Sequence, residues 1–313
     1  MRIAFVGKGG SGKTTLASLF SRWLVSQDKP VLAIDADINQ HLRDTLGIDQ
    51  EQEVHALGDE LLHLKEYLRG TNSRISTAKA MLKTTPPGAG SHLLLLDEPN
   101  PIFDHFAATK GSLRLLMTGG FQEEDLGIRC YHSKTGAVEL ILNHLVDRKE
   151  DTVVIDMTAG ADAFASGLFT RFDLTVIVVE PTKKSLDVYR QYKHYASTFD
   201  VALAVIGNKI TSPDDEAFIR DAVGTDWLGK MPFSSFVRRQ EQQGILPIEQ
   251  LDPEAGQLFA ELEERGRSIP KDWPRFYQQA CDFHRRNAQS WGNATVGEDV
   301  SSQIDPAFQY PVR

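Results

Sequence analysis

A glycine-rich segment near the start of the chain has the residue types and spacing needed to bind phosphate. Residues 7–14 read Gly-Lys-Gly-Gly-Ser-Gly-Lys-Thr, which fits the pattern of Gly, four residues, Gly, Lys and Ser or Thr. Glycines allow successive backbone N–H groups to curl around phosphates, and the N-terminus of a following helix adds a favourable dipole. We expect Lys13 to reach the β and γ phosphates of a nucleotide and the Thr14 hydroxyl to ligate Mg²⁺. The alternative is a glycine-rich turn that happens to carry a lysine.

The elements that must position this loop alternate between short apolar runs and helical stretches, which indicates a parallel sheet covered by helices. Expected strands lie at residues 2–6, 30–34, 93–96, 113–117, 152–155, 174–179, 201–206 and 228–231. Expected helices lie at residues 14–26, 135–146, 185–199, 214–223 and 273–288, and the pattern of residues 57–82 is also helical and charged. The predicted fold class is α/β, a three-layer P-loop NTPase with a mostly parallel sheet flanked by helices.

The domain organisation follows from where this alternation stops. Strands and helices alternate to about residue 265 with no linker rich in Gly, Ser or Pro, so residues 1–265 are expected to form one nucleotide domain. Residues 266–313 are expected to be a C-terminal extension of one helix followed by a polar tail. Because residues 292–313 show little periodicity, we expect this tail to be a loose arm.

Composition excludes several other classes of protein. The chain has 313 residues, with 34 Lys and Arg against 43 Asp and Glu and a net charge of −9, which argues against a general nucleic-acid coat. No apolar run approaches the roughly 18 residues that a membrane-spanning helix needs. The first ten residues do not resemble a signal peptide, and two cysteines, Cys130 and Cys281, cannot build a disulfide framework. A soluble, cytoplasmic globular protein is expected.

Lys8, directly after the first glycine, makes the phosphate-loop motif typical of one family. Residues 8–15 resemble the deviant Walker A motif of the MinD/ParA/ArsA/nitrogenase-iron-protein superfamily of P-loop ATPases. The resemblance implies an ATP-dependent homodimer in which Lys8 reaches across to the partner's nucleotide and supplies transition-state charge. It implies further phosphate contacts from Gly9, Gly10, Ser11, Gly12 and Thr15. The alternative for Lys8 is a solvated surface lysine.

Acidic residues stand at the ends of two expected strands, where ligands of α/β proteins bind. Asp35 and Asp37 resemble the family's switch I, which implies that Asp37 orients the attacking water and that Asp35 supports the water shell of Mg²⁺. Asp156 ends a Walker B strand and would hold Mg²⁺ through a water. Gly160 lies in a segment similar to switch II, where its N–H would contact the γ phosphate. Solvated acids that merely end a strand are the alternative.

Two further pairs resemble the family's base-binding elements. Asn208 and Lys209 follow an apolar strand, and an Asn amide matches the donor and acceptor edge of adenine. Pro232 and Phe233 follow the last expected strand and would line the other side of the base. ATP is favoured over GTP because no Asp follows Lys209 at the spacing of the guanine-reading motif.

Within the superfamily, residues 6–15, 156–160, 177–185 and 232–239 are most similar to the CooC branch, whose ATPases help to insert nickel into carbon monoxide dehydrogenase. That branch carries Cys-x-Cys ahead of a helix, whereas this chain has Cys130 and His132 there. Two subunits could still offer two thiolates and two imidazoles to Zn²⁺ or Ni²⁺ at the dimer interface. Alternatively, Cys130 is a buried thiol and His132 a surface residue.

Three functions therefore stay open. The first is a CooC-like dimeric ATPase, slow and partner-stimulated, that acts as a maturation factor for a client protein such as a metalloenzyme. The second is a MinD/ParA-type positioning or partition ATPase that binds DNA or a membrane-associated partner. The net charge and the lack of a basic amphipathic helix argue against it, although Lys183, Lys184, Arg190 and Lys193 could contact DNA. The third is a metabolic kinase or ligase, in which Lys8 would have no role across a dimer.

Overall fold

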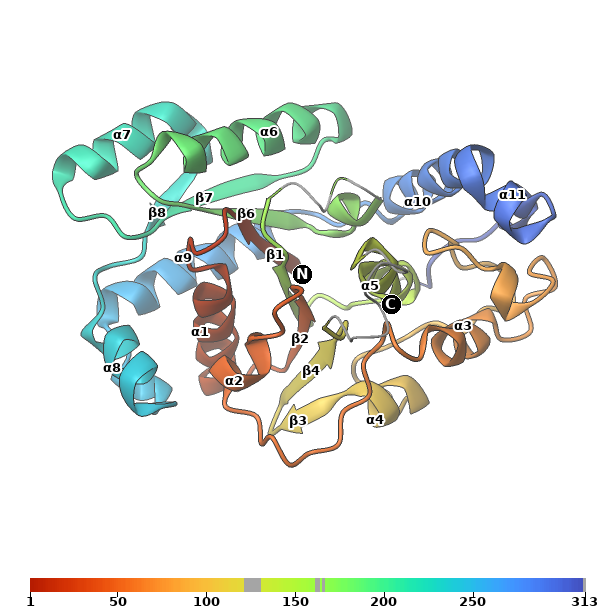
Figure 1. The fold of residues 1–313 in the computed structure, drawn as a ribbon, viewed down its shortest axis with the longest axis horizontal. Helices are drawn as coiled ribbons and strands as arrows, with labels where there is room; N and C mark the ends of the chain where they lie inside the picture. The colour runs from red at the N-terminus through yellow and green to blue at the C-terminus, as the bar shows by residue number, and fades with distance from the viewer. Residues whose placement is uncertain (121–130, 161–163, 165–166, 312–313) are drawn as a thin grey trace.

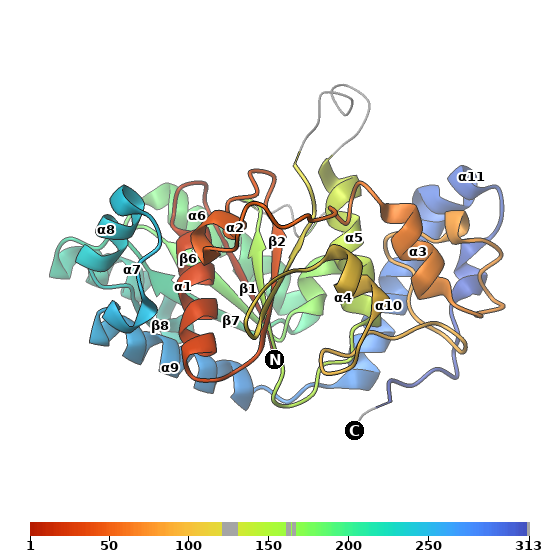
Figure 2. The same cartoon turned by 90° about the horizontal axis from the view of Figure 1, so that it is seen from below.

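One sheet forms the centre of the molecule in the computed structural model, which describes residues 1–120, 131–160, 164 and 167–311 (Figures 1 and 2). Its eight strands within these residues follow the order β3-β4-β2-β5-β1-β6-β7-β8. The strands are β1 (Arg2–Gly7), β2 (Val31–Ala36), β3 (Ala108–Lys110), β4 (Leu113–Met117), β5 (Thr152–Met157), β6 (Leu174–Val179), β7 (Leu203–Gly207) and β8 (Trp227–Lys230). Only the edge strand β3 is antiparallel to its neighbour within this sheet. The predicted α/β class with a mostly parallel sheet is confirmed.

Helices cover both faces of the sheet and create two separate cores. Along β1, Ile3 and Phe5 point into a core that includes α1 (Lys13–Ser26) and α9 (Pro253–Ser268). Ala4 and Val6 point to the opposite face, into a core that includes residues of α5 (Tyr131–His144) and α6 (Lys183–Phe199). This alternation along one strand is what a sheet buried on both faces requires. Figure 1 shows α1 and α5 on either side of the central strands.

The remaining helices are α2 (Leu42–Leu46), α3 (Leu61–Arg69), α4 (Pro101–Phe106), α7 (Pro213–Val223), α8 (Ser235–Gln243), α10 (Trp273–Asn287) and α11 (Asn293–Val296). Most of them add to these two layers, whereas α10 and α11 contribute to two smaller clusters. The helical pattern expected over residues 57–82 forms only α3 and a short 3-10 turn at Ala78–Ala80. Gly70 ends α3 with a positive φ of 52°, a conformation that favours glycine.

One expected strand is wrong. Residues 93–96 lie outside the sheet, because the backbone of Leu94 pairs with the end of α5. The Leu94 N–H donates to the His144 carbonyl, and the Leu94 carbonyl accepts from the Val146 N–H. The apolar residue Leu94 is buried, as a strand residue would be, but it packs in the core beside the helix. The short strand β3, which the sequence pattern did not predict, occupies the edge next to β4.

The C-terminal tail is packed, contrary to the loose arm expected from its lack of periodicity. Val300 is fully buried, and Tyr310 joins Trp273 and Phe276 in a small aromatic core. The Tyr310 hydroxyl donates to the Asn143 carbonyl at 2.6 Å. A few large side chains anchor this segment, so no regular helix or strand period is needed to hold it. The helix α9 runs past residue 265 to Ser268, and the division into two domains near that residue stays a prediction.

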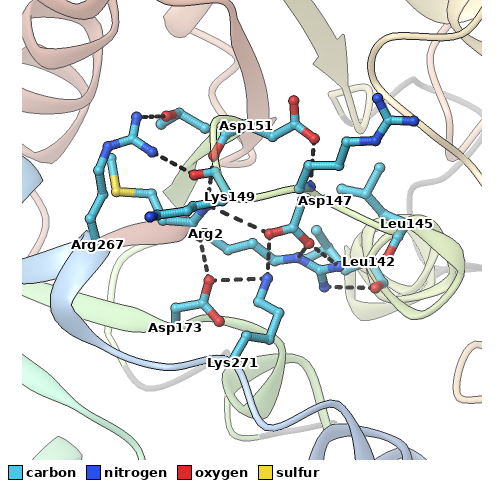
Figure 3. A network of polar contacts seen from close by, with 12 residues as sticks. Arg2, Leu142, Leu145, Asp147, Lys149, Asp151, Asp173, Arg267 and Lys271 are labelled. Carbon is cyan, nitrogen blue, oxygen red and sulfur yellow. Dashed lines mark hydrogen bonds and ion pairs between the residues drawn. The ribbon is translucent and has the colours of Figure 1, made fainter. Parts of the chain in front are cut away.

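A buried ionic network joins this C-terminal region to the start of β1 (Figure 3). Arg2 is fully buried and contacts Asp147 at 2.7 Å, and Lys271 also pairs with Asp147 and contacts Asp173 at 3.0 Å. Burial alone would raise the pKa of Asp147, but Arg2 and Lys271 lower it well below the usual range. The Arg2 guanidinium also lies 4.8 Å from the centre of the Phe276 ring. The network therefore fixes one end of the strand whose other end carries the phosphate loop.

Candidate nucleotide site

The phosphate loop connects β1 to α1, as its sequence predicts. Gly12 caps α1 in a left-handed conformation with φ 99°, and a Cβ atom there would lie 2.3 Å from the Asn208 amide nitrogen. The left-handed backbone favours glycine here, and a Cβ atom would displace the Asn208 amide from its present position. The Ser11 N–H donates to the Lys8 carbonyl at 3.1 Å, and the Lys13 side chain is almost buried, with 5% of its surface exposed. The loop is curled with Lys13 inside it.

A cleft of about 770 Å³ opens beside this loop and brings most of the predicted site residues together. The predicted residues along its wall are Gly9, Gly10, Gly12, Lys13, Thr14, Thr15, Asp37, Asn208, Lys209, Pro232 and Phe233. They come from the ends of β1, β2, β7 and β8, so the cleft lies at the carboxyl edge of the sheet, where α/β proteins bind ligands.

Two buried aspartates that do not themselves line the cleft lie side by side, because the register of β2 and β5 pairs Asp35 with Asp156. Burial raises the pKa of Asp35 to about 7, and burial together with the nearby Asp35 raises the pKa of Asp156 to about 8. The Thr14 hydroxyl donates to one oxygen of Asp156 at 2.6 Å. The other oxygen of Asp156 is buried without a hydrogen-bond partner among the described residues.

This donor set fits Mg²⁺. A hydroxyl and buried carboxylates are the oxygen ligands that the ion prefers, and the unpaired oxygen of Asp156 is available to a water of its shell. Thr14 would ligate the ion directly, with Asp156 and Asp35 holding its waters. Bound Mg²⁺ neutralises phosphate charge during phosphoryl transfer. Asp35 is itself held by N–H groups of Asp37 and Leu42, at 3.1 and 2.9 Å.

Asp37 lies at the wall of the cleft in the loop after β2. Its carboxylate accepts from the backbone and side-chain nitrogens of Asn39, both at 3.0 Å. Gln40 donates to the Asp37 carbonyl and, at 3.0 Å, to the Thr118 hydroxyl at the end of β4. The position of Asp37 is therefore set by a hydrogen-bonded turn that is tied to the neighbouring strand. Its role in orienting water stays a prediction.

Glu180 is a site residue for which the sequence pattern predicted no role. One of its oxygens lies 3.4 Å from the Lys8 ammonium and the other 2.7 Å from the Lys209 ammonium. Burial alone would raise the pKa of Glu180, but Lys209 and Lys8 lower it. Lys209 also donates to the Gly10 carbonyl at 2.6 Å. In the sequence it was visible only as an acid directly after the apolar run of residues 174–179.

The predicted base contacts and the predicted γ-phosphate sensor stay predictions. The Asn208 amide donates to the Ser11 carbonyl at 2.7 Å, so in this structure it ties the end of β7 to the phosphate loop. The Gly160 N–H donates to the Gly7 carbonyl at 3.0 Å. Cys130 lies outside the described residues, as does the side chain of His132, so the predicted Zn²⁺ or Ni²⁺ pair is untested.

Phe233 stands at the rim of the cleft with 83% of its surface exposed. Replacing it by alanine is expected to weaken ATP binding roughly tenfold or more, since stacking of a base on an aromatic ring contributes about 1–3 kcal/mol. Titration calorimetry with a non-hydrolysable ATP analogue measures the effect. Phe218→Ala, an exposed phenylalanine of α7, is the matched control. Equal affinities of Phe233→Ala and wild type would contradict base stacking at this position.

The sequence profile described as "CobQ/CobB/MinD/ParA nucleotide binding domain" matches residues 3–248. The chain belongs to this family. This MinD/ParA-type ATPase is 30% identical over 247 residues to the carbon monoxide dehydrogenase accessory protein CooC of Rhodospirillum rubrum, covering 78% of this chain and 88% of that protein. It is 28% identical over 248 residues to an uncharacterized ATP-binding protein of Methanocaldococcus jannaschii, covering 78% and 90%.

Solved structures show the same fold as this MinD/ParA-type ATPase. A ParA family ATPase from Chlorobium tepidum superposes with a TM-score of 0.57 at 16% identity, over 85% of this chain and 96% of that one. The MinC:MinD complex of Aquifex aeolicus gives a TM-score of 0.51 at 23% identity, over 87% and 98%. Among the described residues, no helix has the length and apolar character to cross a membrane.

Proposed function

We propose that this chain is an ATP-hydrolysing dimeric switch that couples its nucleotide state to a client protein, as a CooC-like maturation factor. The observation that carries the proposal is Lys8: its side chain is 41% exposed and paired with Glu180, whereas Lys13 is almost buried and lines the cleft. The two lysines of one phosphate loop thus differ in exposure, and Lys8 is the one that a partner subunit could reach. The relative named as an accessory protein of carbon monoxide dehydrogenase supports a metalloenzyme as the client.

In the proposed reaction, Lys13 and the N–H groups of the loop hold the β and γ phosphates of ATP. Asp37 orients a water whose oxygen bonds to the γ phosphorus while the bond to the bridging oxygen of ADP breaks. The partner subunit's Lys8 stabilises the charge that spreads over the transferred group, and the water proton leaves with the phosphate product. ATP binding closes the dimer and hydrolysis reopens it, so that the affinity for the client follows this cycle.

Sedimentation velocity with Mg-ATP and with Mg-ADP tests the switch. Asp37→Ala is expected to bind ATP without hydrolysing it and to accumulate as a dimer, whereas the ADP form sediments as a monomer. Asp187→Ala, an exposed acid of α6 outside the cleft, is the matched control. A monomer in every nucleotide state of both variants would overturn the proposal.

Glu180 gives a further prediction, because it holds Lys8 within its own subunit. Glu180→Gln is expected to raise the steady-state rate of ATP hydrolysis about two- to fivefold, since a partly exposed ion pair of up to about 1 kcal/mol no longer opposes the release of Lys8. A coupled phosphate assay over a range of protein concentrations measures this. Glu216→Gln breaks the Lys230–Glu216 pair away from the loop and is the control. A rate below that of wild type would mean that Glu180 supports catalysis.

The partition alternative has less support from the surface of α6. Of the four basic residues that could contact DNA, Arg190 pairs with Asp187 at 2.7 Å and Lys193 pairs with Asp226 at 2.6 Å. Acidic partners reduce the charge that phosphates would otherwise meet. Plasmid binding that falls steeply with added salt would support the partition ATPase alternative.

A further inference from the structure

Three histidines and one glutamate converge on the surface, outside the nucleotide cleft. Glu60 caps the start of α3, His63 lies in the first turn of that helix, His55 precedes it, and His105 comes from α4 (Figure 1). One oxygen of Glu60 lies 2.5 Å from His55 Nδ1, and the other lies 2.8 Å from His105 Nε2. His63 Nδ1 lies 3.8 Å from the same carboxylate.

The imidazole rings are stacked against one another. The His105 ring lies 4.0 Å from that of His55 and 4.7 Å from that of His63, with interplanar angles of 14° and 16°. A neutral imidazole keeps one nitrogen lone pair, and that lone pair is what a metal ion binds.

The spacing of the ligand atoms suits a single ion. One atom from each of His55, Glu60 and His105 lies within 4.8 Å of the other two. Metal–nitrogen bonds of about 2.0–2.1 Å in a tetrahedral site put neighbouring ligand atoms roughly 3.3 Å apart. Small rotations of these side chains therefore suffice to bring three ligands onto one ion.

The backbone that carries these ligands is anchored on one side to the sheet. The N–H groups of Leu57 and Gly58 donate to the carbonyls of Met117 and Thr118 at the end of β4, at 2.9 and 3.0 Å. Asp59 forms an ion pair with Lys134 of α5 at 2.9 Å. His55 and Glu60 thus flank a fixed turn. His105 is held in place because the next residue, Phe106, is fully buried. A preformed ligand set costs less ordering when an ion binds.

We propose that His55, Glu60 and His105 bind one divalent first-row transition cation of the class that prefers imidazole nitrogen, such as Zn²⁺, Ni²⁺ or Co²⁺. The side chains of His105, His55 and Glu60 are 29%, 35% and 35% exposed, so the remaining coordination positions face solvent. A site of this kind exchanges its ion readily, in contrast to closed structural sites with four protein ligands. The proposal rests on these three residues and is independent of the proposed ATPase switch and of Cys130.

Cobalt titration of the metal-free, nucleotide-free protein tests the site, with excess Mg²⁺ present to occupy Thr14 and Asp156. Nitrogen and oxygen ligands give weak visible ligand-field bands, without the near-ultraviolet charge-transfer band that a Cys130 thiolate would add. Calorimetry with Zn²⁺ measures the affinity. Glu60→Gln and His105→Gln are each expected to weaken binding at least about tenfold, because each removes one of three ligands. His194→Gln, an exposed histidine of α6, is the matched control and is expected to bind as wild type does.

Binding of equal strength in wild type and in a combined His55→Gln, Glu60→Gln and His105→Gln variant would overturn the proposal. A thiolate band, or loss of the ion on Cys130→Ala alone, would also overturn it. Thermal unfolding of each variant confirms that the exposed substitutions leave the fold intact. Failure of ATP-dependent dimerisation, measured separately by sedimentation, would overturn the proposed function and leave the cobalt result unchanged.

Discussion

Replacing Lys8 by alanine should lower the kcat of ATP hydrolysis by roughly 10³-fold or more, the range found when a charge supplied across an interface is removed from phosphoryl transfer. ATP affinity should change little, because the proposed phosphate contacts come from Lys13 and the loop N–H groups. Within the described part of the chain, the side-chain partner found for Lys8 is Glu180. Single-turnover kinetics and calorimetry with an ATP analogue separate the two effects. Lys184→Ala, an exposed lysine of α6, is the control.

Mixing two inactive variants shows in which subunit Lys8 acts. In a mixed dimer of Lys8→Ala with Asp37→Ala, one site keeps its own Asp37 and receives an intact Lys8 from the partner. Random mixing should then recover about one quarter of the wild-type activity per site, as expected for a charge supplied in trans. No recovery in a preparation that still forms mixed dimers would place the action of Lys8 within its own subunit and contradict the proposed switch.

Replacing Asp147 by asparagine should reduce the free energy of unfolding by about 3–5 kcal/mol, because it leaves a buried charge without its partner. Arg2 is fully buried, and its guanidinium depends on Asp147 for two close contacts, at 2.7 and 2.8 Å. Lys271 loses the same partner. Urea unfolding followed by circular dichroism measures the change. Asp187→Asn breaks an exposed pair with Arg190 and should stay within about 0.5 kcal/mol of wild type.

The same carboxylate predicts the pH dependence of stability. Its pKa is depressed in the folded protein, so its contribution is fully present above the ordinary Asp value of about 3.9 and is lost as pH falls toward the folded value. Wild type should therefore lose more stability than Asp147→Asn between about pH 5 and pH 2. Parallel pH profiles for the two proteins would argue against an ionised, paired Asp147.

The phosphate loop and the aspartates could be predicted from the sequence because their signals are local. Gly12, Lys13 and Thr14 lie next to one another, and Asp35 and Asp156 each directly end an apolar run. The parallel register then places the two aspartates side by side. Such features depend only on which strands exist and in which direction they run.

Features that depend on packing between distant segments could not be predicted in this way. Glu60 and His105 lie 45 residues apart and meet only because α3 and α4 pack together. Glu180 meets Lys8 across 172 residues. The tail carries no periodic pattern, but the Tyr310 ring packs against those of Trp273 and Phe276. None of these contacts has a signature within a short window of sequence.

The position of β1 in the middle of the sheet has a consequence for synthesis of the protein. Both of its sheet neighbours are made far later, since Arg2 pairs with Val153 in β5 and Ile3 with Leu174 in β6. At about 5–20 residues per second, synthesis takes roughly 10–30 s to reach the first partner strand of β1. Phe276, whose ring lies against the Arg2 guanidinium, is made later still. We therefore expect the nascent chain to carry a complete phosphate-loop sequence that binds no ATP until most of the polypeptide has been made, with its apolar first strand exposed to aggregation during that interval.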